Sequence, residues 1–337
     1  MSSTGTPGDN AFTRESLLGY GRENTFSGVQ SFMRRRYTKD LAGVDVAVSG
    51  IPLDIATTNR PGARFGPAAV RAATADMNSP LWPWGFGPCD HLAVADYGDC
   101  WFDPHRADLV HESIVAHART ILDAGAFPLT LGGDHYITYP LLEALAGRIG
   151  RPLAIVHFDA HCDTWPDEDD RALNHGTMFT KALRRGFIDA SRSVQVGIRT
   201  WNEDFLGIEV LGADWVQAQG TGAVIARILE VVGDAPAYLT FDIDCLDPAF
   251  APGTGTPVAG GLSTAQALAI IRGLLPIDFR GMDLVEVAPA YDKAEVTAYA
   301  GAQICADFLC LLAQRRATAA GKGSLRPAMP ASVRAGS

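Results

Sequence analysis

The sequence predicts an α/β fold built around a mainly parallel sheet, and two observations support this prediction. From Val44 onward, short β-branched and apolar runs alternate with longer segments of helical periodicity, which is the pattern of α/β chains. Most of the short runs are apolar throughout, as expected for parallel strands that helices cover on both faces. The 337 residues are 47% hydrophobic and 20% charged, a composition that excludes disordered and collagen-like structure and fits one large domain.

The expected elements alternate along the chain. Seven segments are expected to be strands because they are short and apolar: Val44 to Ser49, Leu92 to Asp96, Phe127 to Leu131, Leu153 to Phe158, Val194 to Ile198, Tyr238 to Phe241 and Gly281 to Val287. Five longer segments are expected to be helices because their apolar residues recur at helical spacing: Ala107 to Ala124, Tyr139 to Ile149, Gly222 to Val232, Thr264 to Leu275 and Ala294 to Ala317.

The two ends of the chain differ in composition from its centre. Residues 1–40 begin with a polar stretch containing Gly, Ser and Thr and end near a basic cluster, Arg34 to Arg36, so a partly flexible arm is expected. No repeat or linker divides residues 41–318, which are expected to form a single domain. Gly, Ser, Pro and Ala dominate from about Ala319, which predicts a flexible tail over residues 319–337.

Charge and cysteine usage restrict the partners and the compartment. The chain has 38 acidic and 28 basic side chains, a net charge of -10, which disfavours nucleic acid or an anionic membrane and suits a small cationic ligand. No stretch approaches the roughly 18 uncharged apolar residues of a membrane span, and the polar start lacks a signal core. The six cysteines form no CxxC pair, which favours reduced, packed thiols and a cytoplasmic protein.

Six potential metal ligands follow three of the predicted strands. They are His135, Asp159, His161, Asp163, Asp242 and Asp244. The spacings i, i+2 and i+4 would turn these side chains to one face of an extended chain, and the glycines before the first histidine allow a sharp turn. Because ligands gather beyond the carboxyl ends of parallel strands, we expect all six to converge at one place.

The charge of this cluster predicts two metal ions. Four buried carboxylates without compensation would be prohibitive, whereas two dications supply +4 against -4 when both histidines are neutral. The cluster is therefore expected to be binuclear. Oxygen ligands with two imidazoles and no thiolate suit Mn²⁺, and they leave Ni²⁺, Co²⁺ and Zn²⁺ open.

The motifs that contain these ligands resemble those of the ureohydrolase (arginase/agmatinase) family, and most closely those of bacterial agmatinases. The resembling motifs are Gly-Gly-Asp134-His135, Asp159-Ala-His161-Cys-Asp163 and Phe-Asp242-Ile-Asp244-Cys-Leu-Asp-Pro248, within a resemblance that runs from about Gly50 to about Leu312. The resemblance implies a three-layer α-β-α fold with a mainly parallel eight-stranded sheet. It also implies two Mn²⁺ ions and hydrolysis of a guanidino compound to urea and an amine, with agmatine to putrescine as the first choice.

The resemblance also implies roles for individual residues. His175 would pass a proton to the departing amine, because imidazole titrates near the working pH. Glu286 would pair with the guanidinium of the substrate. Asp163 would hydrogen-bond the nucleophile as well as bind metal. The family further implies a homo-oligomer, a trimer or a hexamer.

Substrate choice is expected to depend on loops around the site. Those expected are Trp165 to Asn174, Arg199 to Asp204 and Leu53 to Arg64. Trp165 would stack on an alkyl or cationic tail or form a wall. Asn174 stands where the most similar agmatinases would have an acid, and Arg199, like Arg60 and Arg64, would bind a carboxylate tail.

Other activities remain open at this point. A guanidinobutyrase, a guanidinopropionase or a hydrolase of alkylated guanidines or biguanides would use the same motifs. An accessory subunit of a mixed ureohydrolase assembly, and hence a hetero-oligomer, is a further alternative that the complete ligand set disfavours. A binuclear phosphoesterase is disfavoured because no basic phosphate clamp accompanies the ligands.

Overall fold

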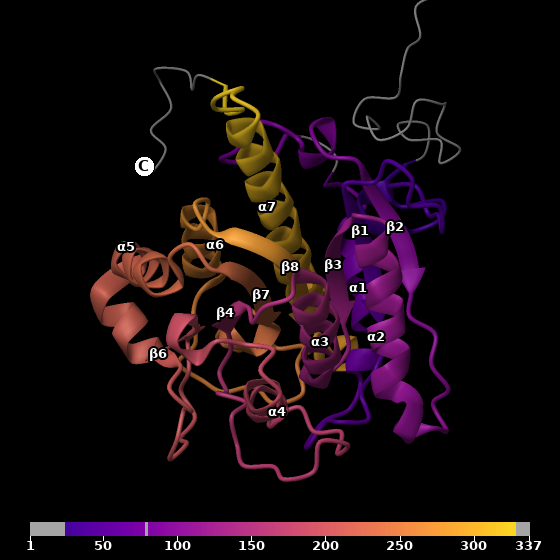
Figure 1. Ribbon diagram of the computed structural model, residues 1–337. Helices are drawn as coiled ribbons and strands as arrows, with labels where there is room; N and C mark the ends of the chain where they lie inside the picture. The colour runs from indigo at the N-terminus through magenta and orange to yellow at the C-terminus, as the bar shows by residue number, and fades with distance from the viewer. Residues whose placement is uncertain (1–23, 78–79, 328–337) are drawn as a thin grey trace, which may run out of the picture.

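The computed structural model describes residues 24–77 and 80–327, and these contain one sheet of eight strands (Figure 1). The strands are β1 (Val46–Ile51), β2 (Val94–Asp99), β3 (Phe127–Gly132), β4 (Ala154–Phe158), β5 (Val194–Val196), β6 (Glu209–Leu211), β7 (Pro236–Asp242) and β8 (Asp278–Val285). Their order across the sheet is β2-β1-β3-β8-β7-β4-β5-β6, and every adjacent pair is parallel. The predicted parallel eight-stranded sheet is confirmed.

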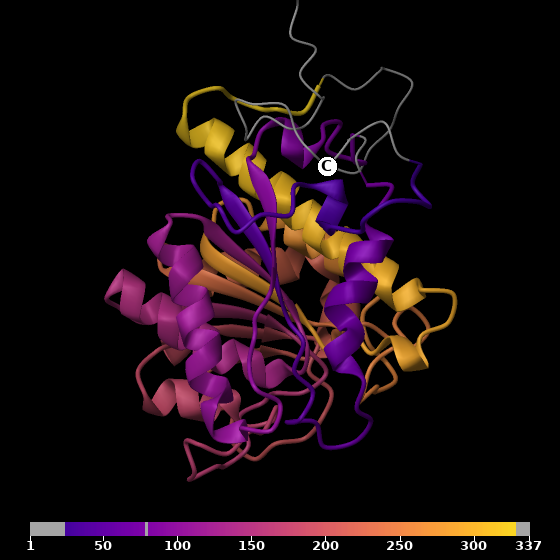
Figure 2. The same ribbon diagram turned by 90° about the vertical axis from the view of Figure 1, so that its right-hand side faces the viewer.

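Helices cover both faces of the sheet. They are α1 (Gly66–Ala73), α2 (Ala107–Asp123), α3 (Thr138–Ile149), α4 (Met178–Arg184), α5 (Ala213–Val232), α6 (Thr264–Gly273) and α7 (Val296–Ala319). One layer contains α1, α7, α6 and α5, which contact one another in that sequence, and the other contains α2, α3 and α4. Each layer has its own large apolar core against the sheet, which lies between them in Figure 2. This arrangement confirms the predicted three-layer α-β-α fold.

The central strands match the prediction because both of their faces are covered. Every residue of β1, β4 and β7 is buried. Strands that are covered on both faces are mostly apolar and do not alternate between apolar and polar residues, which is the pattern these segments show. Three elements were not predicted, namely β6, α1 and α4. Strand β6 begins with a glutamate and is only partly buried, unlike the equally short β5, and α1 and α4 have about two helical turns each, too few to show a period. Helix α5 also begins nine residues before the predicted Gly222, with non-helical dihedral angles at Gly220 dividing it.

The long helix α7 lies inside the protein. Among the described residues it is the one helix that is long and apolar enough to cross a membrane, yet 78% of its most apolar window is buried. Its Asp307 accepts hydrogen bonds from Trp84 Nε1 and Arg272 Nε, both at 2.6 Å. A helix that is apolar all round and covered all round is a core helix.

The described parts of the predicted arm and tail contact the domain. In the arm, Phe32 and Met33 are buried, and the Phe32 amide donates to Asp96 at 2.8 Å. After α7, the Gln314 side chain donates to the Gly323 carbonyl and accepts from the Leu325 amide. Residues 1–23 and 328–337, which complete the predicted arm and tail, lie outside the described residues.

Candidate metal centre and active site

The six predicted ligands come together beyond the carboxyl ends of β3, β4 and β7, but not by the predicted extended alternation. Strand β4 ends at Phe158, so Asp159 to Asp163 form a loop in which Asp163 has a φ of 54°. Asp244 lies in a short 3₁₀ helix, Ile243–Cys245, that follows the last residue of β7. The common strand edge therefore gathers the ligands, while tight turns orient them.

Close backbone packing explains the glycines before His135. A Cβ atom on Gly133 would lie 2.0 Å from the Leu53 carbonyl oxygen and 2.6 Å from the Leu53 nitrogen. The Gly133 amide donates to Ile51, and the Asp134 amide donates to Leu53. The glycine is thus required by the close approach of another chain segment, and not by the sharp turn that the sequence predicted.

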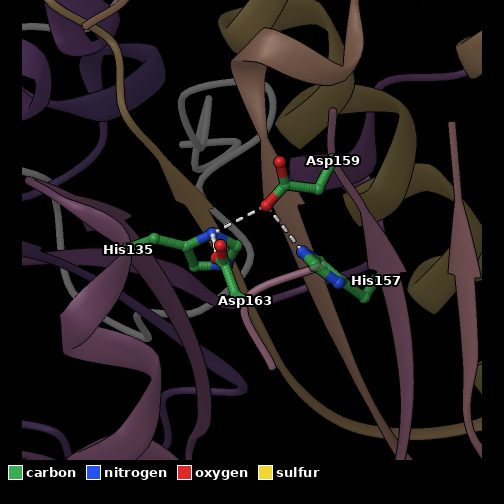
Figure 3. A group of neighbouring side chains, drawn as sticks. All are labelled: His135, His157, Asp159 and Asp163. Atoms are coloured by element: carbon green, nitrogen blue, oxygen red, sulfur yellow. Dashed lines mark hydrogen bonds and ion pairs between the residues drawn. The ribbon is translucent and has the colours of Figure 1, made fainter. Parts of the chain in front are cut away.

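His135 is the centre of a first group of ligands (Figure 3). Its Nδ1 atom lies 3.1, 3.0 and 3.2 Å from carboxylate oxygens of Asp159, Asp163 and Asp242. Its Nε2 atom is 2.8 Å from the Thr240 hydroxyl; when Nε2 carries the ring proton it donates to that hydroxyl, and Nδ1 keeps its lone pair for a metal ion. Nδ1 is buried without a hydrogen-bond partner among the described residues and faces the three carboxylates.

His161 is the centre of a second group. Its Nδ1 atom lies 3.3 Å from Asp159 Oδ1 and 3.1 Å from Asp244 Oδ2. Asp159 uses its other oxygen, Oδ2, in the first group, so this carboxylate connects the two groups. A carboxylate shared between two groups of ligands is the arrangement that a binuclear site needs.

The donor set fits divalent cations. Ligand atoms about 2.1 Å from one ion and at right angles to each other lie about 3 Å apart, which is the spacing found in both groups. Burial, together with the charges of Asp244 and Asp159, raises the pKa of Asp242 well above its usual value. Burial and the charge of Asp159 also raise the pKa of Asp163. Cations between these carboxylates would remove the repulsion and keep them ionised.

His157 was not predicted and is the residue that sequence analysis missed. It precedes Asp159 by two residues, and its Nε2 donates to Asp159 Oδ2 at 2.7 Å (Figure 3). The Gln195 amide donates to its Nδ1 at 3.1 Å, which fixes the proton on Nε2. His157 therefore orients the shared carboxylate. The spacing of two residues between His157, in β4, and Asp159 was the available signal.

Next to the metal ligands, His175 and Glu286 form a buried pair. His175 Nδ1 donates to Glu286 Oε1 at 2.8 Å. Its Nε2 accepts from the Thr58 amide at 3.1 Å when the imidazole is neutral, and donates to the Thr58 hydroxyl at 2.9 Å when the imidazole is protonated. Glu286 Oε1 also accepts from the His135 amide, and Glu286 Oε2 is buried without a hydrogen-bond partner among the described residues. Burial alone would lower the pKa of His175, but the hydrogen bond and charge of Glu286 outweigh it and raise that pKa to about 9.

A cavity of about 260 Å³ opens onto this cluster. Its lining residues are Thr58, His161, Asp163, Trp165, Asn174, His175, Gly176, Thr177, Asp242 and Thr256. The Trp165 ring lies 6.3 Å from the His161 ring, centroid to centroid, so it forms the wall beside the metal ligands. Asn174 accepts from the Gly176 amide at 2.8 Å. No Lys or Arg is among the described residues that line this cavity.

Arg199, which the sequence predicted to bind substrate, is not among the described residues that line the cavity. Its guanidinium donates to five backbone carbonyls, those of Gly197, Asp244, Cys245, Leu246 and Val258. Arg60 donates to the Thr254 and Gly255 carbonyls, and Arg64 pairs with Asp54. These three arginines are therefore held by backbone carbonyls or by a carboxylate of the protein.

Comparison with known proteins gives the family. The model of the arginase family matches residues 44–311. The chain belongs to the arginase family. It is 60% identical over 317 residues to a protein named agmatinase from Chromobacterium violaceum, covering 94% of this chain and 98% of that one. The predicted ureohydrolase membership, and the similarity to bacterial agmatinases, are confirmed.

Solved arginase-family structures share the fold. The crystal structure of a hypothetical agmatinase from Burkholderia thailandensis has a TM-score of 0.88 at 63% identity, covering 92% of this chain and 98% of that one. Proclavaminate amidino hydrolase from Streptomyces clavuligerus has a TM-score of 0.81 at 36% identity, covering 86% and 99%. The arginase family implies a binuclear divalent metal site, and the two groups around His135 and His161 provide the side chains for one.

Proposed function

We propose that this protein hydrolyses agmatine to putrescine and urea, with two Mn²⁺ ions as its cofactors. The observation that carries the proposal is a cavity lined by two carboxylates of the ligand cluster, Asp163 and Asp242, with no Lys or Arg among its described lining residues. Such a cavity attracts a cationic guanidinium and offers no partner for a carboxylate tail. The relatives named agmatinase support the same substrate.

The metal ions would be held by the six predicted ligands, with Asp159 shared. When bound, two divalent cations lower the pKa of water and so supply a nucleophile near neutral pH. Mn²⁺ suits a set of carboxylate oxygens and two imidazoles, and Ni²⁺ or Co²⁺ is the next choice. His157 and Thr240 would orient this set through their hydrogen bonds to Asp159 and His135.

The remaining residues would bind the substrate and move a proton. Glu286 Oε2, buried and without a partner among the described residues, would accept an N–H of the guanidinium. Asp163 lines the cavity and would hold the attacking water by a hydrogen bond. His175 would carry a proton on Nε2 and donate it to the departing amine nitrogen, which must be protonated to leave. Trp165 would cover the alkyl chain of the substrate.

A second candidate is hydrolysis of an alkylated guanidine or biguanide. Asp163 and Asp242 are the two carboxylates among the described lining residues, and both belong to the metal ligands. Trp165 could therefore pack against an alkyl group of the substrate. Apart from the metal ligands, no carboxylate among the described lining residues could pair with an ammonium group at the far end of the substrate. Guanidinobutyrate and guanidinopropionate are less suitable, because Arg60, Arg64 and Arg199 are engaged elsewhere. The role of a non-catalytic subunit in a mixed assembly is disfavoured, because the chain has all six metal ligands together with the proposed catalytic residues His175 and Glu286.

The cellular compartment and the oligomeric state are inferred from the buried cysteines and from exposed aromatic side chains. We infer a cytoplasmic enzyme, because all six cysteines are buried and free, which suits a reducing compartment. We infer a homo-oligomer, a trimer or hexamer, because Phe65, Trp101 and Trp201 expose 62%, 81% and 84% of their surface. Residues 41–318 would be the catalytic domain of each subunit. Light scattering on the purified protein would measure the assembly.

Urea release by purified protein tests the substrate. The protein is loaded separately with Mn²⁺ and Ni²⁺ and offered agmatine, 4-guanidinobutyrate, 3-guanidinopropionate, arginine, guanidine, and N,N-dimethylated guanidines and biguanides. We expect the highest kcat/KM with agmatine and Mn²⁺. Preference for a dimethylated compound would move the assignment to the second candidate. No urea from any substrate with either metal would contradict both.

A further inference from the structure

Lys181 in α4 is a fully buried cation for which the proposed chemistry has no use. Its side chain has a relative exposure of 0%. An ammonium buried without partners is very costly, so the structure must compensate its charge. Its Nζ lies 3.0 Å from Asp167 Oδ2, donates to the Ala172 carbonyl and lies 5.9 Å from the centroid of the Tyr136 ring. The cation is compensated mainly by groups of one loop.

That loop, residues 165–174, contains no helix or strand and is attached to α4 at both of its ends. At its start, Asp167 Oδ2 accepts from the Thr177 hydroxyl at 2.7 Å, and the Trp165 carbonyl accepts from the Thr180 hydroxyl at 2.9 Å. Near its end, the Ala172 carbonyl is bound by Lys181. Because one ammonium binds both ends, it closes the loop and reduces the conformations available to it.

The two ends of loop 165–174 are also parts of the cavity wall. Trp165 opens the loop and lies beside His161, and Asn174 closes it immediately before His175. A shift of the loop would therefore move the surface that faces the substrate tail, while the metal ligands lie outside the loop, Asp163 being the nearest at two residues before Trp165. The effect of the loop on binding should depend on the tail of the substrate and not on its guanidinium group.

We propose that Lys181 is a positioning residue that fixes loop 165–174 on α4 and thereby sets the recognition of the substrate tail by Trp165 and Asn174. The proposal rests on the proposed hydrolysis of a guanidino compound. A purely structural role for Lys181 would change stability alone. The distinguishing property is selectivity between substrates that share the guanidinium and differ in the tail.

The test compares Lys181→Met, which keeps the aliphatic length and removes the charge, with Asp167→Asn, which removes the same ion pair from the loop side. Arg227→Met is the matched control, because it removes the contacts of Arg227 with Glu209 and Glu230 on the surface and away from the cavity. Urea release is measured with agmatine and with methylguanidine, which has the same reacting group and no tail. Trypsin cleavage after the exposed Arg171 is followed by mass spectrometry in the same preparations.

For Lys181→Met and Asp167→Asn we expect the KM for agmatine to rise about tenfold, since a displacement of about 1 Å has large effects on positioning. Kinetics with methylguanidine should change less than about twofold, and cleavage after Arg171 should accelerate at least about fivefold. The control should match the wild type. Unchanged cleavage and an unchanged preference for agmatine would overturn the proposal, as would an equal loss with both substrates while Arg171 stays protected. If wild type releases no urea, the proposed function fails, and cleavage after Arg171 still decides whether Lys181 holds the loop.

Discussion

Replacing Glu286 by Gln should produce a defect that depends strongly on pH. The glutamate accepts the His175 Nδ1 proton at 2.8 Å, and its charge raises the His175 pKa to about 9 despite burial. A glutamine keeps the shape and removes the charge, so the pKa should fall to the ordinary 6.5 or below. The proton that His175 donates would then be missing at alkaline pH.

The size of this defect follows from the two pKa values. At pH 8 about 91% of His175 is protonated with a pKa of about 9, against about 3% with a pKa of 6.5, a loss of about thirtyfold. At pH 6 the corresponding loss is only about 1.3-fold. Loss of a guanidinium contact at Glu286 would add a factor that is the same at both pH values. The total defect should therefore grow about twentyfold between pH 6 and pH 8.

The assay is the pH profile of kcat/KM for agmatine in wild type and Glu286→Gln, at saturating metal. Glu143→Gln is the matched control, because Glu143 also pairs with a histidine, His111, at 3.0 Å but lies outside the cavity. Its profile should coincide with that of the wild type. A Glu286→Gln defect of equal size at pH 6 and pH 8 would refute the argument that Glu286 keeps His175 protonated.

Three further predictions follow from the metal centre and its supports. Chelation of the metal should lower Tm by about 7 °C in differential scanning calorimetry, because two sites filled at 100 times Kd contribute about 5 kcal/mol and a chain of 337 residues unfolds with an entropy of about 0.7 kcal/mol/K; an unchanged Tm would contradict a metal-stabilised cluster. His157→Phe should weaken Mn²⁺ affinity about 10- to 100-fold in a chelator competition, and wild-type affinity would show that the bond to Asp159 does not matter. Arg199→Met should cost about 3 kcal/mol in urea unfolding without changing substrate preference, whereas altered preference would restore its predicted role in the pocket.

The sequence was sufficient for the fold and for the convergence of the ligands. Uninterrupted apolar runs indicate strands covered on both faces, and parallel strands bring their carboxyl ends to one edge. The local conformation could not be predicted, because turns after β4 and β7, and not strand alternation, orient Asp163 and Asp244. Strand β6 was missed because it begins with a glutamate and is only partly buried, and helices α1 and α4 were missed because they are too short to show a period.

The contacts of three residues could not be predicted from the sequence. Arg199 looks like a ligand for anions in sequence, yet its five carbonyl partners come from separate segments that only folding brings together. His157 lies in an apolar strand where a core histidine is unremarkable until Gln195 and Asp159 appear on either side of it. Lys181 is a lysine in a short helix, and nothing in the one-dimensional pattern indicates its burial against loop 165–174.

The most direct test of the account is a titration of metal-free protein with Mn²⁺, in which bound metal and urea release from agmatine are measured on the same samples. We predict that activity rises with occupancy and reaches its maximum at two Mn²⁺ per chain, because Asp159 connects two groups of ligands. Asp159→Asn should prevent both loading and turnover. Full agmatine hydrolysis without bound metal, or two bound ions without any urea release from agmatine, would contradict a binuclear metal centre that hydrolyses agmatine.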